Sequence, residues 1–283
     1  MQCYLCGGEE HKTRSGRVRD DLKIKILECN SCGLVFLSSR SHIIDGHYEK
    51  SGMHDEIPDI QSWLNETRSD DQRRYNFLRD KILNQSVLDF GCGAGGFIEL
   101  AKSSSDSISG VELEEALQPS FKSRGLTVFQ NLEQAKASKK KWEVITCFHV
   151  VEHLLDPIDV LHELSSMLKK GGEIVIEVPS ADDALLTLFD NQAFQGFTYW
   201  SQHLYLFNAN TMRKLIEKAG LKLNWIKHIQ RYSLANHLYW LANGEPGGHK
   251  HWAFMDDNEL NKQYEQQLAA LGLTDTIIAS ISL

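Results

Sequence analysis

The chain has 283 residues, of which 42% are hydrophobic and 24% are charged, a composition typical of a globular protein with one large domain or a large and a small one. The formal net charge of −8 argues against a protein that binds nucleic acid mainly through phosphate contacts. Apolar runs are shorter than the roughly 18 residues that a membrane span needs, and the start "MQCYLCGG" lacks the pattern of a secretory signal. We therefore expect a cytoplasmic protein with no membrane association.

Residues 1–40 are predicted to form a small zinc ribbon. Cys3, Cys6, Cys29 and Cys32 make two C-x2-C pairs, and a glycine follows the second cysteine of each pair. Four thiolates around a tetrahedral ion suit Zn²⁺, and four protein ligands leave no open position for chemistry. We expect a structural zinc ion that holds short β-strands together, with a redox or iron site as the alternative.

Residues 41–85 are polar, and we expect them to form a helical linker or cap. From residue 86 onward, short β-type runs alternate with helical patterns. The runs are "SVLDF", "SISGVEL", "GLTVFQ", "EVITCFHV", "GEIVIEVP", "LKLNWIKHIQ" and "DTIIASISL". Strands that alternate with helices predict an α/β fold with a doubly wound, Rossmann-like sheet of seven mostly parallel strands over residues 86–283.

The stretch "VLDFGCGAGGF" is the first candidate binding motif. A strand, an acid, a glycine loop and a helix follow one another, which places a ligand at the carboxyl edge of a parallel sheet. Glu112 ends the next strand, where a carboxylate can accept hydrogen bonds from ribose hydroxyls. Gly91, Gly93 and Gly96 also match G-x-G-x-x-G, so these residues alone leave a nicotinamide or flavin cofactor open.

The downstream segment "EVITCFHVVEHLLDPIDVLHELSSMLKKGGEIVIEVPS" extends the pattern. Together with "VLDFGCGAGGF" and "SGVELEEA", it resembles the motifs of class I S-adenosylmethionine (SAM)-dependent methyltransferases. "QHLYLFNANTMRKLIEKAGL" and the four cysteines are similar to a subfamily that includes sugar methyltransferases with an N-terminal zinc-binding region. The resemblance covers about residues 86–230 and implies SAM as the cofactor.

The resemblance also implies which residues bind this cofactor. The glycine loop would pack against its methionine part, Glu112 would bind the ribose, and the strand ends would line the rest of the site. The cofactor-binding residues expected from these matches are Asp89, Gly91, Gly93, Glu112, Asn131, Leu132, Phe148 and His149.

Six histidines are candidates for the catalytic base: the favoured His149, His153 and His203, and a later group of His237, His249 and His251. Transfer of a methyl group to a hydroxyl requires an aligned acceptor and removal of its proton, for which histidine is suited near neutral pH. His149 and His153 lie in "FHVVEH", and His203 lies in "TYWSQHLYLF", in the region of the family's acceptor loop. For His153 and His203, a structural role for the imidazole is the alternative interpretation.

The expected acceptor is a small molecule, and by resemblance a sugar, a nucleotide sugar or a glycan. The chain has no N/D-P-P-Y/F tetrapeptide and no Pro-Cys nucleophile, so methylation of nucleic-acid bases is disfavoured. Relatives that methylate sugar carbon carry a further C-terminal domain that is not seen in this sequence, which favours oxygen or nitrogen as the acceptor. The alternatives are a non-catalytic zinc-ribbon adaptor and a methyltransferase that acts on RNA or protein.

The segment 231–272 separates the last two predicted strands. It is about forty residues long and mixes aromatic residues and histidines with "GEPGGHKH", and long connections are often functional. We expect this segment to form a lid or wall of the acceptor site. A helical element that forms a homodimer is the alternative.

Overall fold

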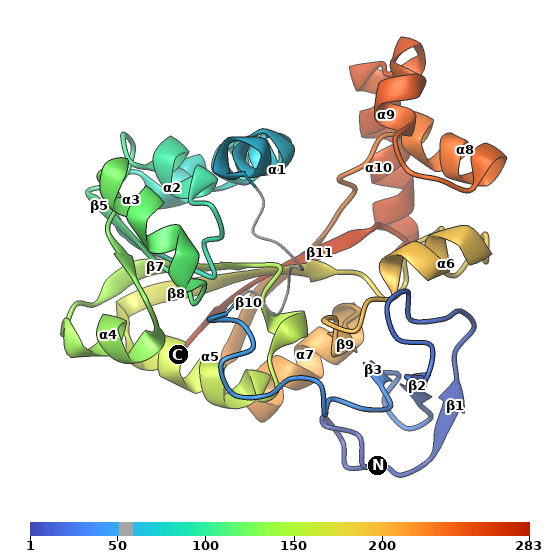
Figure 1. The fold of residues 1–283 in the computed structure, drawn as a ribbon, viewed down its shortest axis with the longest axis horizontal. Helices are drawn as coiled ribbons and strands as arrows, with labels where there is room; N and C mark the ends of the chain where they lie inside the picture. Colours follow the sequence, from blue (N-terminus) through green and yellow to red (C-terminus); the bar gives the residue numbers. More distant parts are fainter. Residues whose placement is uncertain (51–58) are drawn as a thin grey trace.

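A seven-stranded sheet forms the centre of the computed structural model, which describes residues 1–50 and 59–283 (Figure 1). Its strand order is β10-β11-β8-β7-β4-β5-β6. The strands are β4 (Ser86–Phe90), β5 (Ser107–Val111), β6 (Val128–Phe129), β7 (Trp142–Phe148), β8 (Leu168–Pro179), β10 (Lys222–Ile229) and β11 (Thr276–Ser282). Each strand lies within or overlaps one of the runs identified in the sequence, so the predicted α/β fold is confirmed.

The sheet is mostly parallel, as predicted. Strands β8, β7, β4, β5 and β6 are parallel to one another, whereas β11 is antiparallel to both β8 and β10. Strand β4 lies between β7 and β5, so the chain winds outward from β4 in both directions. Such a switch point opens a crevice at the carboxyl ends of the central strands.

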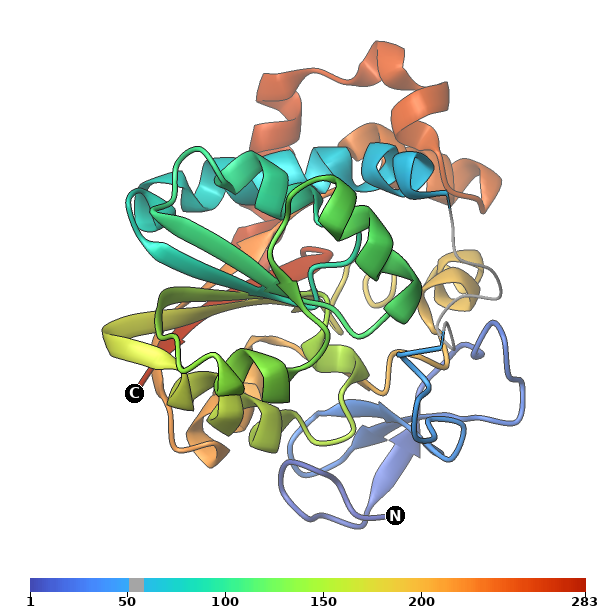
Figure 2. The same cartoon turned by 60° about the vertical axis from the view of Figure 1, so that its left-hand side comes forward.

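Helices cover both faces of the sheet because successive strand residues point to opposite sides. On β4, Val87 packs with the cluster that includes Leu78 and Ile82, whereas Leu88 packs in the cluster that includes Leu161 and Leu215. Figures 1 and 2 show α1, α2 and α3 on one side of the sheet and α4, α5 and α7 on the other. Their bounds are α1 (Ile60–Ile82), α2 (Gly96–Ala101), α3 (Gln118–Ser123), α4 (Leu132–Ala137), α5 (Pro157–Ser166) and α7 (Ala209–Lys218).

The N-terminal region shares a sheet with the core. Strands β1 (His11–Thr13), β2 (Ile26–Cys29) and β3 (Val35–Leu37) form an antiparallel ribbon, and β9 (Tyr205–Leu206) adds a fourth strand from the core. Phe36 pairs with Tyr205, and Val35 pairs with Leu206. The ribbon is therefore attached to the core by backbone hydrogen bonds and not only by the continuity of the chain.

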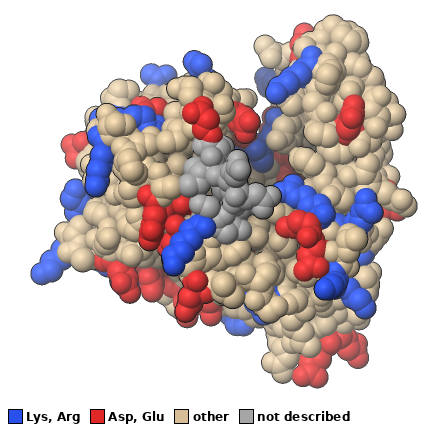
Figure 3. All heavy atoms as spheres, in the orientation of Figure 1, with Lys and Arg blue, Asp and Glu red and all other residues tan. Residues whose placement is uncertain are grey.

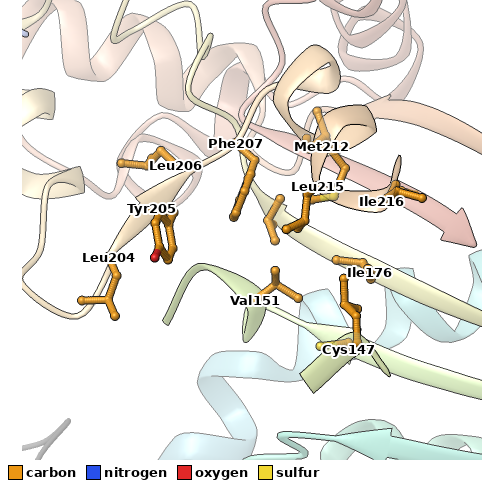
Figure 4. Close-up of a cluster of buried hydrophobic side chains, with 14 of the residues drawn as sticks. Cys147, Val151, Ile176, Leu204, Tyr205, Leu206, Phe207, Met212, Leu215 and Ile216 are labelled. Carbon is orange, nitrogen blue, oxygen red and sulfur yellow. The ribbon is translucent and has the colours of Figure 1, made fainter. Parts of the chain in front are cut away.

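The segment 204–207 packs both with the ribbon and with the core. Figure 4 shows Phe207 pointing toward Met212 and Leu215 of α7, with Ile176 of β8 and Val151 lying close by. All five side chains are buried. Because this segment also carries β9, the apolar cluster fixes the position of the ribbon and of the residues just before it.

The segment 231–272 is helical. It contains α8 (Leu234–Asn243), α9 (Gly248–His251), the 3₁₀ turn η3 (Ala253–Met255) and α10 (Asn258–Leu271), which project from the sheet near α6 (Gln192–Thr198). In Figure 3, a notch separates this projection from the part of the molecule that carries α1, and acidic and basic side chains are interspersed on the visible face.

Helix α1 occupies most of the described part of the expected 41–85 linker or cap, and residues 51–58 of that expectation lie outside the described residues. Among the described residues, no helix combines the length and apolarity needed to cross a bilayer.

Candidate active site

The glycine loop after β4 packs too closely against its neighbours for larger residues. Gly91 has φ +73°, and a Cβ at this position would lie 2.4 Å from Cγ2 of Val150. A Cβ on Gly96, at the start of α2, would lie 2.2 Å from Oδ2 of Asp71. Both distances are shorter than the non-bonded contacts of real Cβ atoms, so a larger residue would force the loop, Val150 or Asp71 to shift; at Gly91 the positive φ adds backbone strain.

The carboxylate of Glu112 is held at the end of β5 by backbone amides. Its Oε2 accepts a hydrogen bond from the amide of Gly93 at 2.8 Å, and its Oε1 accepts one from the amide of Glu114 at 3.0 Å. Each carboxylate oxygen has two acceptor sites, so both oxygens retain capacity for a ligand hydroxyl. Burial raises the pKa of Glu112.

A cavity of about 380 Å³ lies at the carboxyl ends of β4, β5 and β7. Its volume falls in the range of small-molecule sites. The residues that line it are Tyr48, Trp63, Thr67, Asp70, Asp71, Arg74, Asp89, Phe90, Gly91, Cys92, Gly93, Ala94, Gly96, Phe97, Val111, Glu112, Leu113, Glu114, Phe148, His149, Val150, His153, Leu154 and Arg231.

Asp89 is a buried acid on the inner side of this cavity. The hydroxyl of Thr146 on β7 donates a hydrogen bond to Oδ1 of Asp89 at 2.7 Å. Burial raises the pKa of Asp89 to about 7, and the nearby charge of Asp71 adds to this effect. The carboxyl group is therefore close to half protonated at neutral pH and can gain or lose a proton when a charged ligand binds.

His149 has a left-handed backbone with φ +54°, which is uncommon for a residue with a side chain. Its amide donates to the carbonyl of Glu177 at 2.7 Å, and its Nδ1 lies 3.2 Å from Oε1 of Glu152. Its Nε2 lies 3.3 Å from Oε1 of Glu177 and 3.2 Å from Nη1 of Arg231. These contacts fix the orientation of the imidazole at the cavity wall.

Helix α1 supplies charges that compensate the buried Glu177. Both terminal nitrogens of Arg73 donate to Glu177, at 3.0 and 2.8 Å, and Nε of Arg74 donates to it at 2.9 Å. Burial alone would raise the pKa of Glu177, but the His149 hydrogen bond and the Arg74 charge outweigh burial and hold this pKa well below its usual range. Glu177 thus stays ionised and ties α1 to the sheet.

Arg231 links the end of β10 to α1 across the cavity. Its guanidinium donates to both carboxylate oxygens of Asp70, with the Nε contact at 2.9 Å. Burial raises the pKa of Asp70, but the Arg231 charge outweighs it and lowers the pKa below its usual value. Sequence reasoning missed this pair, because the two residues are far apart in the chain and charges on a helix usually face solvent.

His153 and His203 lie next to each other, with ring centroids 5.1 Å apart. Nδ1 of His153 lies 2.8 Å from the carbonyl of Gln202, and Nδ1 of His203 lies 3.3 Å from the carbonyl of Thr198. Burial lowers the pKa of His153, and burial together with the charge of His153 lowers the pKa of His203 to about 3. Both imidazoles are therefore neutral at pH 7.

The structure brings most of the expected site residues to one cavity. Seven of them line it: Asp89, Gly91, Gly93, Glu112, Phe148, His149 and His153. Among the described residues, three expected positions do not line it: Asn131, Leu132 and His203. The Asn131 side chain instead accepts a hydrogen bond from Gln134 and caps α4, while His203 contacts the cavity-lining His153 from the side of β9.

Several cavity residues had no signal in the sequence analysis. They lie on α1, before it and after β10: Tyr48, Trp63, Thr67, Asp70, Asp71, Arg74 and Arg231. A helical linker or cap was expected in this region, but the face that the helix turns toward the glycine loop is set by packing against α2.

The four ribbon cysteines meet at one point. Their Sγ atoms lie within 4.8 Å of one another, and the Cys3–Cys32 and Cys6–Cys29 sulfur pairs are both 3.5 Å apart. The amide of Gly7 donates to the Cys3 carbonyl at 2.8 Å, closing a tight turn around the first pair. Four thiolates in a compact cluster fit a tetrahedral Zn²⁺ ion, whose Zn–S bonds are about 2.3 Å long.

A family model described as "Methyltransferase domain" matches residues 61–224, more than half of the chain. A ubiquinone biosynthesis O-methyltransferase of Haemophilus ducreyi is 27% identical over 119 residues, which cover 36% of this chain and 50% of the relative. A relative of the same name from Pseudomonas fluorescens is 25% identical, over 46% of this chain and 54% of the relative. The chain therefore spans about half the length of these relatives.

Two solved structures share the fold. A SAM-dependent methyltransferase from Archaeoglobus fulgidus has a TM-score of 0.50 and 21% identity, covering 78% of this chain and 99% of the other. A SAM-dependent methyltransferase from Thermotoga maritima has a TM-score of 0.50 and 17% identity, covering 78% and 93%. The family match resolves the ambiguity of the glycine loop in favour of SAM over a dinucleotide: the chain contains a class I SAM-dependent methyltransferase domain and belongs to the methyltransferase domain family.

Proposed function

We propose that this enzyme transfers a methyl group to a hydroxyl of a small acceptor that contains a sugar, either a nucleotide sugar or a glycan. The proposal of a hydroxyl acceptor rests on one observation: His149 and His153 line the same cavity as Glu112 and the glycine loop. A cavity of about 380 Å³ suits a small molecule. The sugar is supported by the sequence resemblance alone.

The proposed cofactor site comprises the cavity residues that the sequence analysis expected. Glu112 accepts hydrogen bonds from the ribose, and Gly91 and Gly93 let the backbone approach the cofactor closely. Phe148, the last residue of β7, lines the cavity. The ionised carboxylate of Asp89 would attract a positively charged ligand in this cavity. Bound SAM supplies a methyl group on a sulfonium. Neither Asn131 nor Leu132 lines the cavity, and Asn131 caps α4, so their contact with the cofactor stays a prediction.

The acceptor hydroxyl is proposed to lose its proton beside the histidines. The proposed catalytic group comprises His149, His153 and His203, with His203 acting through its contact with His153. With a pKa of about 3, His203 is a weak base, so a direct proton transfer to it is the least favourable of the three. Arg231 borders the same space, and we assign the acceptor wall to the segment 231–272 that begins with it.

The ribbon is proposed to bind a structural zinc ion through Cys3, Cys6, Cys29 and Cys32. The sulfur cluster described above supports this assignment. The proposed organisation is a zinc ribbon over residues 1–40, a cap over 41–85 and a methyltransferase core over 86–283. Because β3 pairs with β9, the ion would also support the segment that carries His203.

The experiment that tests the acceptor is a transfer assay with SAM labelled in its methyl group. Purified enzyme is incubated with a panel of nucleotide sugars, and products are analysed by mass spectrometry for the gain of one methyl group. Glu112→Ala, at a SAM concentration too low to saturate this variant, is the control with reduced transfer. Label that enters none of the sugars in the panel would contradict the sugar acceptor.

A second acceptor class is favoured by the relatives, which are named ubiquinone biosynthesis O-methyltransferases. Phenols with one or two free hydroxyls therefore belong in the same panel. Transfer to these compounds and not to sugars would support transfer to a hydroxyl oxygen but would replace the sugar by a phenol as the acceptor.

A further inference from the structure

Three potential metal ligands from two distant parts of the chain converge beside the cavity. Glu152 and His153 lie in the 3₁₀ turn η2 (Val151–His153), and His203 lies before β9. One ligand atom from each residue lies within 4.8 Å of the other two, and Oε1 of Glu152 is 3.9 Å from Nε2 of His153. Two ligands on one ion at about 2.1 Å lie roughly 3 to 3.5 Å apart, so small side-chain rotations complete such a site.

Both imidazoles are oriented as metal ligands are. The Nδ1 atoms of His153 and His203 face the backbone carbonyls of Gln202 and Thr198, at 2.8 and 3.3 Å. A neutral imidazole that donates its Nδ1 proton to a carbonyl leaves the lone pair on Nε2. A hydrogen bond from Nδ1 commonly fixes the tautomer and the ring orientation of a histidine that binds a metal through Nε2.

The carboxylate of Glu152 has an oxygen that nothing in the described part of the chain satisfies. Its side chain is fully buried. Oε1 lies 3.2 Å from Nδ1 of His149, whereas Oε2 has no hydrogen-bond partner among the described residues. A buried carboxylate oxygen without a partner is costly, and a bound cation would remove this cost.

We propose that Glu152, His153 and His203 bind a divalent first-row transition-metal ion at the edge of the active-site cavity. Two imidazoles and one carboxylate are a donor set typical of Mn²⁺, Fe²⁺ or Zn²⁺ sites that keep open coordination positions. His153 lines the cavity, so the open positions face the space assigned to the acceptor.

The proposed ion gives the hydroxyl acceptor a means of losing its proton, and this part rests on the proposed function. A hydroxyl that ligates a divalent cation has a lowered pKa and releases its proton to water. The oxygen then forms a bond to the methyl carbon while the carbon–sulfur bond breaks, and the electron pair of that bond remains on sulfur. In this arrangement His153 and His203 bind the metal through their lone pairs, so the ion takes over the role in proton loss that the proposed function gives to these two histidines.

The test is a titration of zinc-loaded full-length protein with Mn²⁺, followed by electron paramagnetic resonance and calorimetry. Mn²⁺ competes poorly for thiolate sites, so it reports on nitrogen and oxygen ligands. We expect one Mn²⁺ per chain, and we expect Glu152→Gln, His153→Gln and His203→Gln each to weaken its binding at least 10-fold. A parallel titration with SAM shows that each variant remains folded.

The control variant carries His249→Gln together with His251→Gln. These residues belong to the "GHKH" segment of α9, which offers another closely spaced histidine pair on which an ion could bind adventitiously. This variant should bind Mn²⁺ like the parent. Loss of Mn²⁺ binding in this control variant would overturn the proposed site. An unchanged Mn²⁺ affinity in both Glu152→Gln and His203→Gln would do the same.

Transfer assays separate the site from its role. Transfer that requires Mn²⁺ and is lost in His203→Gln supports both. Mn²⁺ binding combined with metal-independent transfer overturns the role in proton loss and leaves the site. If no hydroxyl compound is methylated but Mn²⁺ still binds, the proposed function is wrong and the metal site stands.

Discussion

Glu112 and Gly93 are joined by a hydrogen bond of 2.8 Å, from the amide of Gly93 to Oε2 of Glu112. This bond connects the end of β5 to the glycine loop after β4, so the two sequence motifs form one structural unit. The carboxylate is already oriented by the protein before a ligand arrives, which lowers the entropic cost of binding.

Glu112→Ala should weaken SAM binding without unfolding the protein. Hydrogen bonds to a charged group contribute about 1.5 to 3 kcal/mol each, so we expect the Kd to rise on the order of 10- to 100-fold. Calorimetric titration with SAM measures the change. The matched control is Glu115→Ala, an exposed glutamate in the neighbouring turn η1 (Glu115–Leu117). An unchanged Kd for Glu112→Ala would remove the ribose assignment.

SAM binding should strengthen as pH rises from 6 to 8. Burial raises the pKa of Asp89 to about 7, so below pH 7 the carboxyl is mostly neutral. A positively charged ligand favours the ionised form, and binding then releases a proton, which makes the affinity increase with pH through about 7. Calorimetry in two buffers of different ionisation enthalpy detects this proton. The Asp89→Asn variant should show neither proton release nor the pH dependence.

The raised pKa of Asp89 also affects the free energy of unfolding, which this group makes smaller as pH rises. Between the unfolded pKa of about 3.9 and the folded pKa, the folded state binds more protons than the unfolded state, so the contribution of Asp89 to stability falls as pH rises. Asp89→Asn should therefore lose less stability than the parent between pH 5 and pH 7.5. Urea unfolding at several pH values measures the difference, and parallel curves for the two proteins would contradict the assignment.

Arg231→Met should destabilise the protein because it leaves Asp70 beside the cavity without its main partner. Removing one partner of a buried pair costs about 3 to 5 kcal/mol, and the remaining contact of Asp70 with Arg73 at 3.2 Å should reduce this to about 1 to 3 kcal/mol. A double-mutant cycle with Asp70→Asn in urea isolates the pair.

The exposed pair between Lys12 and Glu28 is the comparison for this cycle. It has a similar distance of 3.0 Å, but the Lys12 side chain is 63% exposed. The coupling energy of this pair should lie below about 1 kcal/mol. Equal coupling in the two pairs would show that burial of Arg231 has no energetic consequence.

Cys29→Ser should release zinc and lower the Tm of the whole protein. Because β3 pairs with β9 of the core, loss of the ion should also disturb the segment around His203, and each kcal/mol lost lowers the Tm by roughly 2 to 4 °C. Zinc analysis and calorimetry measure both effects. Lys12→Ala, on the same ribbon, is the control that should retain zinc. A Cys29→Ser protein with full zinc content would exclude the four-cysteine site.

The sequence predicted the sheet because its signals are local. "SVLDF" and "EVITCFHV" are short β-type runs, and neighbouring residues of a strand point to opposite faces, as the structure shows for Val87 and Leu88. The positive φ of Gly91 likewise fits the tight turn that the glycine pattern predicts. These features depend on backbone geometry within a few residues.

The cavity wall on α1 could not be predicted in the same way. The sequence suggests a helix over Ile60–Ile82, but the side that faces the cavity depends on how α1 packs against α2. The pairing of Asp70 with Arg231 joins residues 161 positions apart, and such a distance in sequence leaves no periodic signal. The charges of α1 therefore look like a solvated face until the tertiary structure is known.

The sequence by itself determined the type of sheet, the glycine loop with Glu112 and the grouping of four cysteines, since each follows from spacing and chemistry along the chain. Only the tertiary structure decided that β9 extends the ribbon, that α1 and Arg231 close the cavity, and that His203 meets Glu152 and His153. These contacts arise when distant segments bury apolar surface together, and burial depends on the packing of the whole chain and not on any single segment.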